Sequence, residues 1–347
     1  MCAKKISELS EREEKRAMEI YQKSIVIDCL SVAPTLKHPE YLTEIMDAGV
    51  TATHFTVYMP HEHLLEALDR IAGWYEMAGQ HDTIIALRVD DIVRAKEESR
   101  FCAIMGTQNA RTIGDNIKLL RILHTLGIRI MQLAYDEQNY IGSGGDEGDC
   151  GVTKFGRKVI EEMNRIGILI DVSHCGEKTV MDAIRYSQAP IAITHANPRA
   201  KVDHYRCKTD EQIIALAEKG GVIGVTAWSR TAMVKKGTRP HIEDFLDLME
   251  YVIELVGVDH VGFGTDLTPN WDWELDEYRE FVERYPGLNT VDGKAIDRKE
   301  RTVDGLHHVS KIGNIARGLV ARGYSEEDIQ KILGGNFLNL LRKVWRN

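Results

Sequence analysis

The chain lacks the features of membrane, secreted and disulfide-rich proteins. It contains no uninterrupted apolar run near the ~18 residues that span a bilayer. Residues 1–16 carry many charges and have no apolar core of the kind found in a signal peptide. Its six cysteines are scattered without a Cys-x-x-Cys pair, which is typical of free thiols in a reducing compartment. We therefore expect a cytoplasmic protein without a membrane partner.

Nucleotide-binding motifs and an excess of positive charge are also absent. No Gly-x-Gly-x-x-Gly motif follows a predicted strand and no Walker loop is present, which argues against nucleotide-binding folds. The formal net charge of −9 argues against a nucleic-acid partner. The apolar content of 43% is sufficient for a large core. A small molecule is the expected partner.

Short apolar runs alternate with helical segments along most of the chain. Eight of these runs are predicted strands, and a ninth, Thr83–Leu87, is expected to be an accessory strand. The eight are residues 24–29, 50–57, 101–106, 128–133, 168–172, 191–194, 222–226 and 260–264. Strands that alternate with helices indicate a parallel sheet with crossover helices. Eight such units favour an α/β fold of the closed (β/α)8 type, the TIM barrel, over an open sheet.

One domain, residues 1–347, is the simplest interpretation, because no linker or repeat divides the chain. A charged amphipathic helix is predicted at residues 7–23. Residues 307–346 are expected to form two or three helices, broken near glycines, that pack on the barrel. The two longest irregular segments, 136–151 and 267–298, follow barrel strands, where loops commonly carry substrate contacts and lids.

Polar side chains follow three of the predicted strands. His174 follows residues 168–173, His195 follows residues 191–194, and Asp266 follows the last strand. The carboxyl ends of barrel strands meet at one face, where active sites lie in this fold. Imidazole and carboxylate groups are common zinc ligands, and the metal they hold can polarise a carbonyl and lower the pKa of bound water towards ~7. The pattern predicts a metal or catalytic site.

Two further polar residues lie near the same strand ends. Arg206 comes shortly after the sixth strand, and its guanidinium fits a bidentate contact with a substrate carboxylate. A surface ion pair with a neighbouring acidic residue is the alternative for this side chain. Tyr135 ends the fourth strand and is expected either to donate a hydrogen bond to substrate or to serve as a rim aromatic.

With these residues the chain resembles the membrane (renal-type) dipeptidase family, the M19 peptidases of the amidohydrolase superfamily. The motifs that carry the resemblance are Gly167–His174, Ala189–His195, Arg206 with Thr209–Asp210, and Val261–Asp266, supported by Phe55–Pro60, Gly127–Arg129 and Phe155–Arg157. The resemblance covers nearly the whole chain and implies a TIM barrel, a homodimer and a two-zinc site. In it, His174 and His195 resemble the ligands of one metal. Asp266 resembles a ligand of the other and a proton acceptor, and Arg206 resembles the residue that binds a substrate carboxylate.

The chain departs from the family pattern at the metal ligands. The first strand of the family ends in Asp-Gly-His-Asn-Asp, whose histidine and second aspartate bind one zinc. Leu30 and Val32 stand at these two positions here. Gln108 replaces the glutamate that bridges the two metals, and Tyr135 replaces a substrate-contacting histidine. Because a neutral amide cannot offset the repulsion between two close cations, a two-metal site is not expected.

The resemblance and its departures together predict a mononuclear site. One divalent metal is the predicted cofactor; zinc is expected, and iron, manganese or nickel would also suit these donors. Its predicted ligands are His174, His195, Asp266 and Gln108. His54 is a further candidate ligand, with a packing role as the alternative, and the role of Cys29 and Ser31 in the vacated position stays open. Direct acid–base action of the histidines without a metal is the other alternative.

Three functions are open at this point. The first is a metal-dependent hydrolase of a C–N bond, amide or cyclic amide, in a small molecule that bears a carboxylate. Its catalytic residues would be Asp266 and His195. Its substrate contacts would be Arg206, Tyr135, Asn139 and Tyr58. The second is a lyase, decarboxylase or isomerase on the same barrel. The third is an inactive binding protein, against which the retained polar groups at the barrel mouth argue. We prefer the first.

Overall fold

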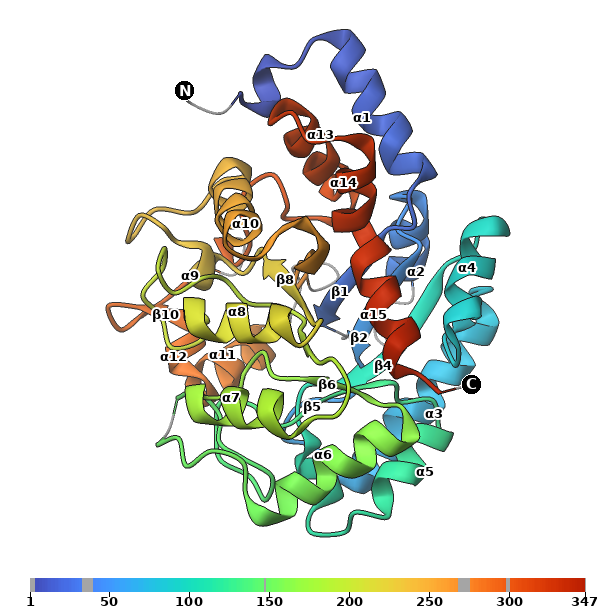
Figure 1. Ribbon diagram of the computed structural model, residues 1–347, viewed down its shortest axis with the longest axis vertical. Helices are drawn as coiled ribbons and strands as arrows, with labels where there is room; N and C mark the ends of the chain where they lie inside the picture. Colours follow the sequence, from blue (N-terminus) through green and yellow to red (C-terminus); the bar gives the residue numbers. More distant parts are fainter. Residues whose placement is uncertain (1–3, 33–39, 147, 268–274, 298–299, 347) are drawn as a thin grey trace.

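The structure is a computed structural model, which describes residues 4–32, 40–146, 148–267, 275–297 and 300–346. At its centre, eight parallel strands form one sheet in the order β1-β2-β4-β5-β6-β7-β8-β9 (Figure 1). Their bounds are β1 Ile27–Val32, β2 Ala52–Thr56, β4 Cys102–Thr107, β5 Ile130–Gln132, β6 Leu169–Asp171, β7 Ala192–Ile193, β8 Val222–Thr226 and β9 Val261–Gly264. Successive strands of the chain are neighbours in the sheet, apart from the accessory strand β3, as expected for a (β/α)8 barrel.

The sheet closes between its first and last strands. The backbone N–H of Val32 donates to the carbonyl of Leu267 over 2.9 Å, and the N–H of Asp266 donates to the carbonyl of Leu30 over 2.9 Å. The Ser31 hydroxyl donates to the same Leu267 carbonyl over 2.7 Å. The predicted TIM-barrel fold is confirmed.

The first strand begins later than its sequence predicts. Ser24, the expected first residue, instead ends α1 (Glu11–Lys23), because its N–H and its hydroxyl both donate to the carbonyl of Ile20. The strand then continues beyond its predicted end to Val32, because its last residues pair with the segment that follows β9. The predicted accessory strand is present as β3 (Ile84–Ile85), which pairs with the start of β4.

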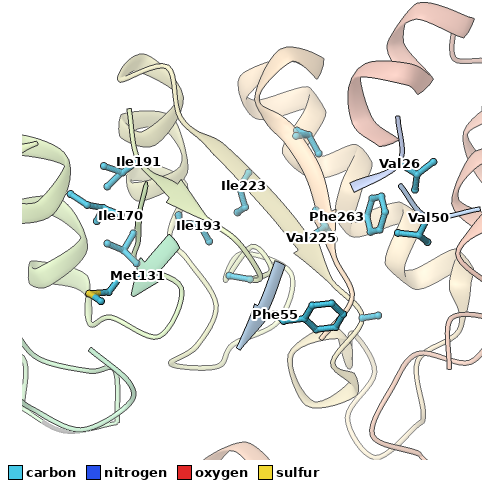
Figure 2. Packing of buried hydrophobic residues seen from close by; sticks show 14 of the residues in the cluster. Val26, Val50, Phe55, Met131, Ile170, Ile191, Ile193, Ile223, Val225 and Phe263 are labelled. Atoms are coloured by element: carbon cyan, nitrogen blue, oxygen red, sulfur yellow. The ribbon is translucent and has the colours of Figure 1, made fainter. Parts of the chain in front are cut away.

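Helices surround the barrel and cover the outward-facing side chains of its strands. Figure 2 shows part of this apolar layer, in which Ile170, Ile223 and Phe263 are buried. The helices between the strands are α2 (Glu40–Asp47), α3 (Leu64–Gln80), α4 (Val89–Glu97), η2 (Ala110–Ile113), α5 (Leu119–Thr125), α6 (Lys154–Ile166), α7 (Glu177–Tyr186), α8 (Asp210–Glu218), α9 (Ser229–Ala232), α10 (Ile242–Val256) and η3 (Val258–His260). None of the helices in the described ranges combines the length and the apolar character that crossing a membrane requires.

Local capping sets the bounds of the helices. The side chain of Thr153 caps the start of α6, and Gly167, in a left-handed conformation (φ 89°), ends it. The N-terminal helix is shorter than predicted, because Ser10 caps α1 and Ile6–Glu8 form the separate 3-10 helix η1. A glycine turn separates η2 from α5.

The C-terminal helices pack on the barrel. They are η5 (Val309–Lys311), α13 (Gly313–Ala321), α14 (Glu326–Gln330), the π-helical turn η6 (Lys331–Gly335) and α15 (Asn336–Val344). Both predicted breaks occur, one after α13 and one at the π-helical turn, where a Cβ on Gly334 would lie 2.3 Å from the carbonyl oxygen of Ile25. α15 covers the N-terminal end of the barrel, since Phe337 is buried in one cluster with Ile104. α1 lies beside α13 (Figure 1).

The two long segments that follow barrel strands differ from each other. The described part of 136–151 is irregular, as predicted. The segment 267–298 is more regular than predicted. It contains α11 (Leu275–Arg284), α12 (Pro286–Asn289) and a hairpin of β10 (Thr290–Val291) and β11 (Lys294–Ala295). Residues 147, 268–274 and 298–299 lie outside the described residues.

Close contact between strands leaves no room for a side chain at Gly224 of β8. A Cβ there would lie 2.1 Å from the carbonyl oxygen of Thr194, the residue before His195. We expect Gly224→Ala to lower the free energy of unfolding by about 1–3 kcal/mol or more, because a backbone carbonyl must move. Gly79→Ala in α3, where nothing lies within 4 Å of the new Cβ, is the matched control. Equal urea midpoints for the two variants would contradict this packing.

Candidate active site

A cavity lies at the C-terminal end of the barrel and brings most of the predicted site residues together. The predicted residues that line it are Gln108, Tyr135, His174, His195, Arg206 and Asp266. The other described residues in its wall are Val32, Thr56, Met59, Pro60, Thr226, Trp228, Thr231, Phe281, Leu288 and Arg301. Phe281 and Leu288 come from α11 and α12, so the segment predicted to carry substrate contacts forms part of this wall.

One buried aspartate, Asp171 at the end of β6, fixes the backbone before both histidines. Its carboxylate accepts hydrogen bonds from the N–H groups of Ser173 (3.0 Å) and Thr194 (3.1 Å). It also accepts a hydrogen bond from the Thr194 hydroxyl (2.8 Å). The residue before His174 and the residue before His195 are therefore tied to the same carboxylate.

Hydrogen bonds to the Nδ1 atoms define which ring nitrogen of each histidine carries the proton. His174 Nδ1 lies 3.0 Å from Oδ1 of Asp136, and an ionised carboxylate only accepts, so Nδ1 is the donor. His195 Nδ1 lies 2.8 Å from the hydroxyl oxygen of Thr194. That hydroxyl already donates to Asp171, so it accepts from Nδ1. Both Nε2 atoms are therefore left with lone pairs.

These two Nε2 atoms face each other at 3.0 Å. Two lone pairs at this distance repel unless a proton or a metal cation lies between them. Burial, and then the nearby positive charge of Arg206, lower the pKa of His174 well below its usual value. Burial, and then His174, do the same to the pKa of His195. A proton is therefore disfavoured there, and the donor set suits a metal cation.

A third group that could bind a cation beside the two imidazoles is the side-chain amide of Gln108. Its Nε2 lies 3.1 Å from His195 Nε2, and a turn of the amide would present Oε1 instead. In the described ranges, no group of three or more His, Cys, Asp or Glu side chains is arranged to hold a metal. Leu30 is fully buried in β1, and Val32 lines the cavity. Two apolar side chains therefore stand where the family pattern has ligands of the first metal. The residues fit one cation and do not fit two.

Asp266 lines the same cavity as the two imidazoles, but among the described residues these three side chains do not form a group that could hold a metal. It follows β9 in a left-handed conformation (φ 57°), fixed by its backbone bond to Leu30. Burial raises the pKa of its carboxyl to about 6, and the positive charges of Arg206 and Arg301 limit this rise. Of the described residues in the cavity wall, Asp266 alone carries a carboxylate. Its chemistry suits proton transfer, and Gln108 is the remaining candidate for a third metal ligand.

Tyr135, which stands where the family pattern has a histidine, packs against the imidazole of His174. The rings of Tyr135 and His174 are stacked with centroids 3.8 Å apart. Tyr285, between α11 and α12, meets Tyr135 edge-on with ring centroids 5.1 Å apart. Tyr135 thus contacts both the His174 ring and the α11–α12 segment.

Two predicted substrate contacts, Tyr58 and Asn139, are not among the described residues that line the cavity. Tyr58 is buried in the apolar layer around the barrel. The side-chain amide of Asn139 forms hydrogen bonds with the backbone near it in the chain. It accepts from the N–H groups of Ile141 (2.7 Å) and Gly142 (3.1 Å), and it donates to the carbonyl of Leu133 (2.8 Å). We therefore assign packing to Tyr58 and loop shaping to Asn139.

The other residues left open by the sequence lie beneath the cavity. His54 fills the space over Gly106, and its Nδ1 lies 2.8 Å from the carbonyl of Cys29. It is not among the described residues of the cavity wall, which favours the packing alternative. Burial raises the pKa of the Cys29 thiol well above its usual value, so this thiol is unreactive. Ser31 closes the barrel.

Sequence reasoning missed three residues of this site. Asp136, which holds His174, follows the fourth strand, and the strand-end rule that singled out Tyr135 would also have found it. Trp228 follows β8 and carries the same signal. Arg301 reaches the cavity from a segment far beyond β9, and no local pattern marks it.

Comparison with known proteins identifies the family. The sequence model of the membrane dipeptidase family, peptidase family M19, matches residues 15–276 and 277–347. The chain belongs to this family. It is 30% identical to dipeptidase tcpJ of Claviceps purpurea (strain 20.1) over 265 residues, which are 75% of this chain and 55% of the relative. The chain spans about half the length of the curated M19 relatives it matches.

Solved structures share the fold of the chain. An amidohydrolase from Pseudomonas aeruginosa is 32% identical, with a TM-score of 0.86 over 95% of this chain and 99% of that chain. Dipeptidase AC, described as a metallopeptidase of family M19, is 22% identical, with a TM-score of 0.75 over 92% of this chain and 98% of that chain. The second likeness supports the fold alone.

Asp136 accepts a hydrogen bond from His174 Nδ1 and so fixes the orientation of that ring. Loss of this carboxylate should therefore weaken metal binding. We expect Asp136→Ala to lower metal affinity about 10–100-fold, because the His174 ring loses its partner. Asp136→Asn, whose Oδ1 still accepts a hydrogen bond, should lower it less. Competition with a chromophoric chelator measures both, and Asp203→Ala, an exposed aspartate, is the control. Equal affinities for Asp136→Ala and Asp203→Ala would refute this role.

Proposed function

We propose that the chain is a mononuclear metal-dependent hydrolase that cleaves a C–N bond, an amide or a cyclic amide, in a small molecule bearing a carboxylate. The observation that carries the proposal is the 3.0 Å approach of the Nε2 atoms of His174 and His195, whose Nδ1 atoms are engaged by Asp136 and Thr194. Membership of the M19 family and the dipeptidase names of the relatives support a dipeptide-like substrate.

The ligands of the proposed site are His174, His195 and Gln108, whose amide would turn its Oε1 toward the cation. A divalent metal bound there would supply Lewis acidity to the scissile carbonyl. Softness and geometry of these donors suit zinc. Leu30 and Val32 argue for one metal, because an alkyl side chain offers no lone pair. We also propose a homodimer and a cytoplasmic location, which rest on the family resemblance and on the sequence respectively.

Asp266 is the proposed proton carrier. Water adds to the carbonyl carbon, the C–N bond breaks, and Asp266 carries one water proton to the leaving nitrogen. The proposal gives His195 no separate acid–base step, because its Nε2 is spent on the metal. A guanidinium of the cavity wall, Arg206 or Arg301, would bind the substrate carboxylate, and Tyr135 would keep water and substrate on the metal face of His174.

Metal removal tests the cofactor. We expect protein purified without an affinity tag to lose dipeptide hydrolysis after chelation, and one equivalent of a divalent metal to restore it. A His174→Ala/His195→Ala variant should hold no metal, because its two main donors are gone. His63→Ala, an exposed histidine at the start of α3, should keep full occupancy. Full activity after exhaustive chelation, or occupancy retained in the double variant, would refute the metal site.

Asp266 and the fate of solvent oxygen test hydrolysis. We expect Asp266→Asn to lower kcat about 10²–10⁴-fold, because the amide cannot accept the proton from water. Metal content should stay unchanged, since Asp266 is not a ligand in this proposal. In ¹⁸O-water, each turnover of the unaltered protein should place one labelled oxygen in the acid product. Turnover without label would favour a lyase or isomerase on the same barrel.

A further inference from the structure

A second cavity, of about 660 Å³, lies at the N-terminal end of the barrel. Arg129, which directly precedes β5, lines it, and so does Ile166 at the end of α6, the helix before β6. Arg346, which follows α15, completes the wall, and α15 packs beside α4 (Figure 1). The candidate active site lies at the opposite ends of the same strands, so the two cavities are separate.

The second cavity concentrates positive charge in an acidic protein. Four arginines line it, Arg88, Arg94, Arg129 and Arg346, and the described residues of its wall include one carboxylate, Asp91. The chain as a whole has a formal net charge of −9. A cleft lined by charges of one sign raises the local concentration of ions of the opposite sign. The wall therefore favours an anionic ligand.

Asp91 cannot neutralise this wall, because both its oxygens are engaged at the start of α4. One oxygen accepts hydrogen bonds from the backbone N–H groups of Leu87 (3.0 Å) and Arg88 (2.9 Å). The other accepts a hydrogen bond from the guanidinium of Arg94 (3.0 Å). Asp91 thus offsets one of the four arginines. Within the described part of the chain, the guanidinium groups of Arg88 and Arg346 have no acceptor.

Arg129 is a buried cation without an anionic partner. It is 7% exposed, and buried arginines are usually paired with an anion. Its Nε donates to the carbonyl of Leu87 (2.9 Å), and one terminal nitrogen donates to the carbonyls of His124 (2.6 Å) and Ile128 (3.2 Å). These acceptors are neutral and hold the side chain in place. Among the described residues, no carboxylate forms an ion pair with Arg129, and its second terminal nitrogen has no partner.

His124 adds an unsatisfied polar atom to the same wall. Its Nε2 is buried and has no hydrogen-bond partner among the residues that the structure describes. Burial, and then the positive charge of Arg129, lower the pKa of His124 to about 4. The ring is therefore neutral at neutral pH, and the tautomer protonated at Nε2 can donate to an anion.

The donors come from separate elements, which favours a phosphate over a carboxylate. Arg88 precedes α4, His124 is in α5, Arg129 precedes β5 and Arg346 follows α15. A phosphate monoester presents three acceptor oxygens around one atom, whereas a carboxylate presents two oxygens in one plane. Guanidinium groups bind phosphate oxygens in bidentate geometry.

The rest of the wall suits an apolar group attached to that phosphate. The side chains of Ile85, Leu87 and Ile166 line the same cavity. Its volume of about 660 Å³ lies within the range of small-molecule sites.

We propose that this cavity binds a small organic phosphate, a phosphate monoester with an apolar group, through Arg88, Arg129, His124 and Arg346. The site lies outside the candidate active site. The proposal therefore does not depend on the hydrolase reaction or on the metal.

Calorimetry with matched probes tests the proposal. The probes are phenyl phosphate, phenol and benzoate, which share one ring and differ in the anionic group. The unaltered protein should bind phenyl phosphate at one site per chain, at least about tenfold more tightly than phenol, because charge-assisted hydrogen bonds are added. Benzoate should bind less tightly than phenyl phosphate. Equal binding of phenyl phosphate and phenol, or tighter binding of benzoate, would overturn the proposal.

Single substitutions locate the binding site. Arg88→Ala removes an exposed guanidinium without an acceptor among the described residues, so it should not disturb folding. We expect it to weaken phenyl phosphate binding about tenfold. Arg129→Lys keeps the charge but loses the planar fork, and it should weaken binding as well. Arg12→Ala removes the same charge from an exposed position in α1 and is the matched control.

Two results would place the phosphate elsewhere and overturn the proposal. Equal affinities for Arg88→Ala and Arg12→Ala would assign the binding to another surface of the chain. Chelation of the unaltered protein should leave phenyl phosphate binding unchanged, so loss of binding after chelation would assign it to the metal site. Retained binding in a protein that hydrolyses no amide would instead refute the proposed reaction alone.

Discussion

The site depends on one unfavourable contact: the Nε2 lone pairs of His174 and His195 face each other. Asp136 and the Thr194–Asp171 pair fix the proton of each ring on Nδ1, and the strand ends bring the two Nε2 atoms to 3.0 Å. Burial opposes the proton that would relieve their repulsion. The fold therefore keeps a strained donor pair that a metal cation would stabilise, and several neighbouring contacts serve to hold it.

The vacated metal position has been used to close the barrel. Leu30, Ser31 and Val32 continue β1, and their backbone and hydroxyl groups pair with Asp266 and Leu267. Apolar side chains fit this strand because Leu30 is enclosed by the barrel and Val32 forms part of the cavity wall. A continuous strand with apolar side chains thus occupies the positions where the family pattern has ligands of the first metal.

Much of the barrel could be predicted from sequence, because its strands and helices are marked locally. Thr153 and Gly167 cap the two ends of α6, and His174 and His195 closely follow apolar strands. The predicted start of β1 was wrong, because Ser24 donates a hydrogen bond to the end of the preceding helix α1. The strand extends beyond its predicted end because it pairs with Leu267, which is distant in the chain.

Roles of side chains were harder to predict than their positions. Arg206, Tyr135 and Gln108 all reach the cavity, as expected. Asn139 has the right chemistry for a substrate contact, but its own loop uses its amide, and Arg301 enters from a remote segment without a local signal. Hydrogen-bond partners decide such roles, and a single sequence does not contain them.

Anomalous diffraction from crystals of the native protein tests the central claim most directly. Data collected on both sides of the absorption edge of the bound metal should give one peak per chain, between the Nε2 atoms of His174 and His195. Gln108 should complete the coordination with its Oε1. Two peaks, or one beside Leu30 and Val32, would contradict the mononuclear site, and the absence of any peak would contradict metal dependence itself.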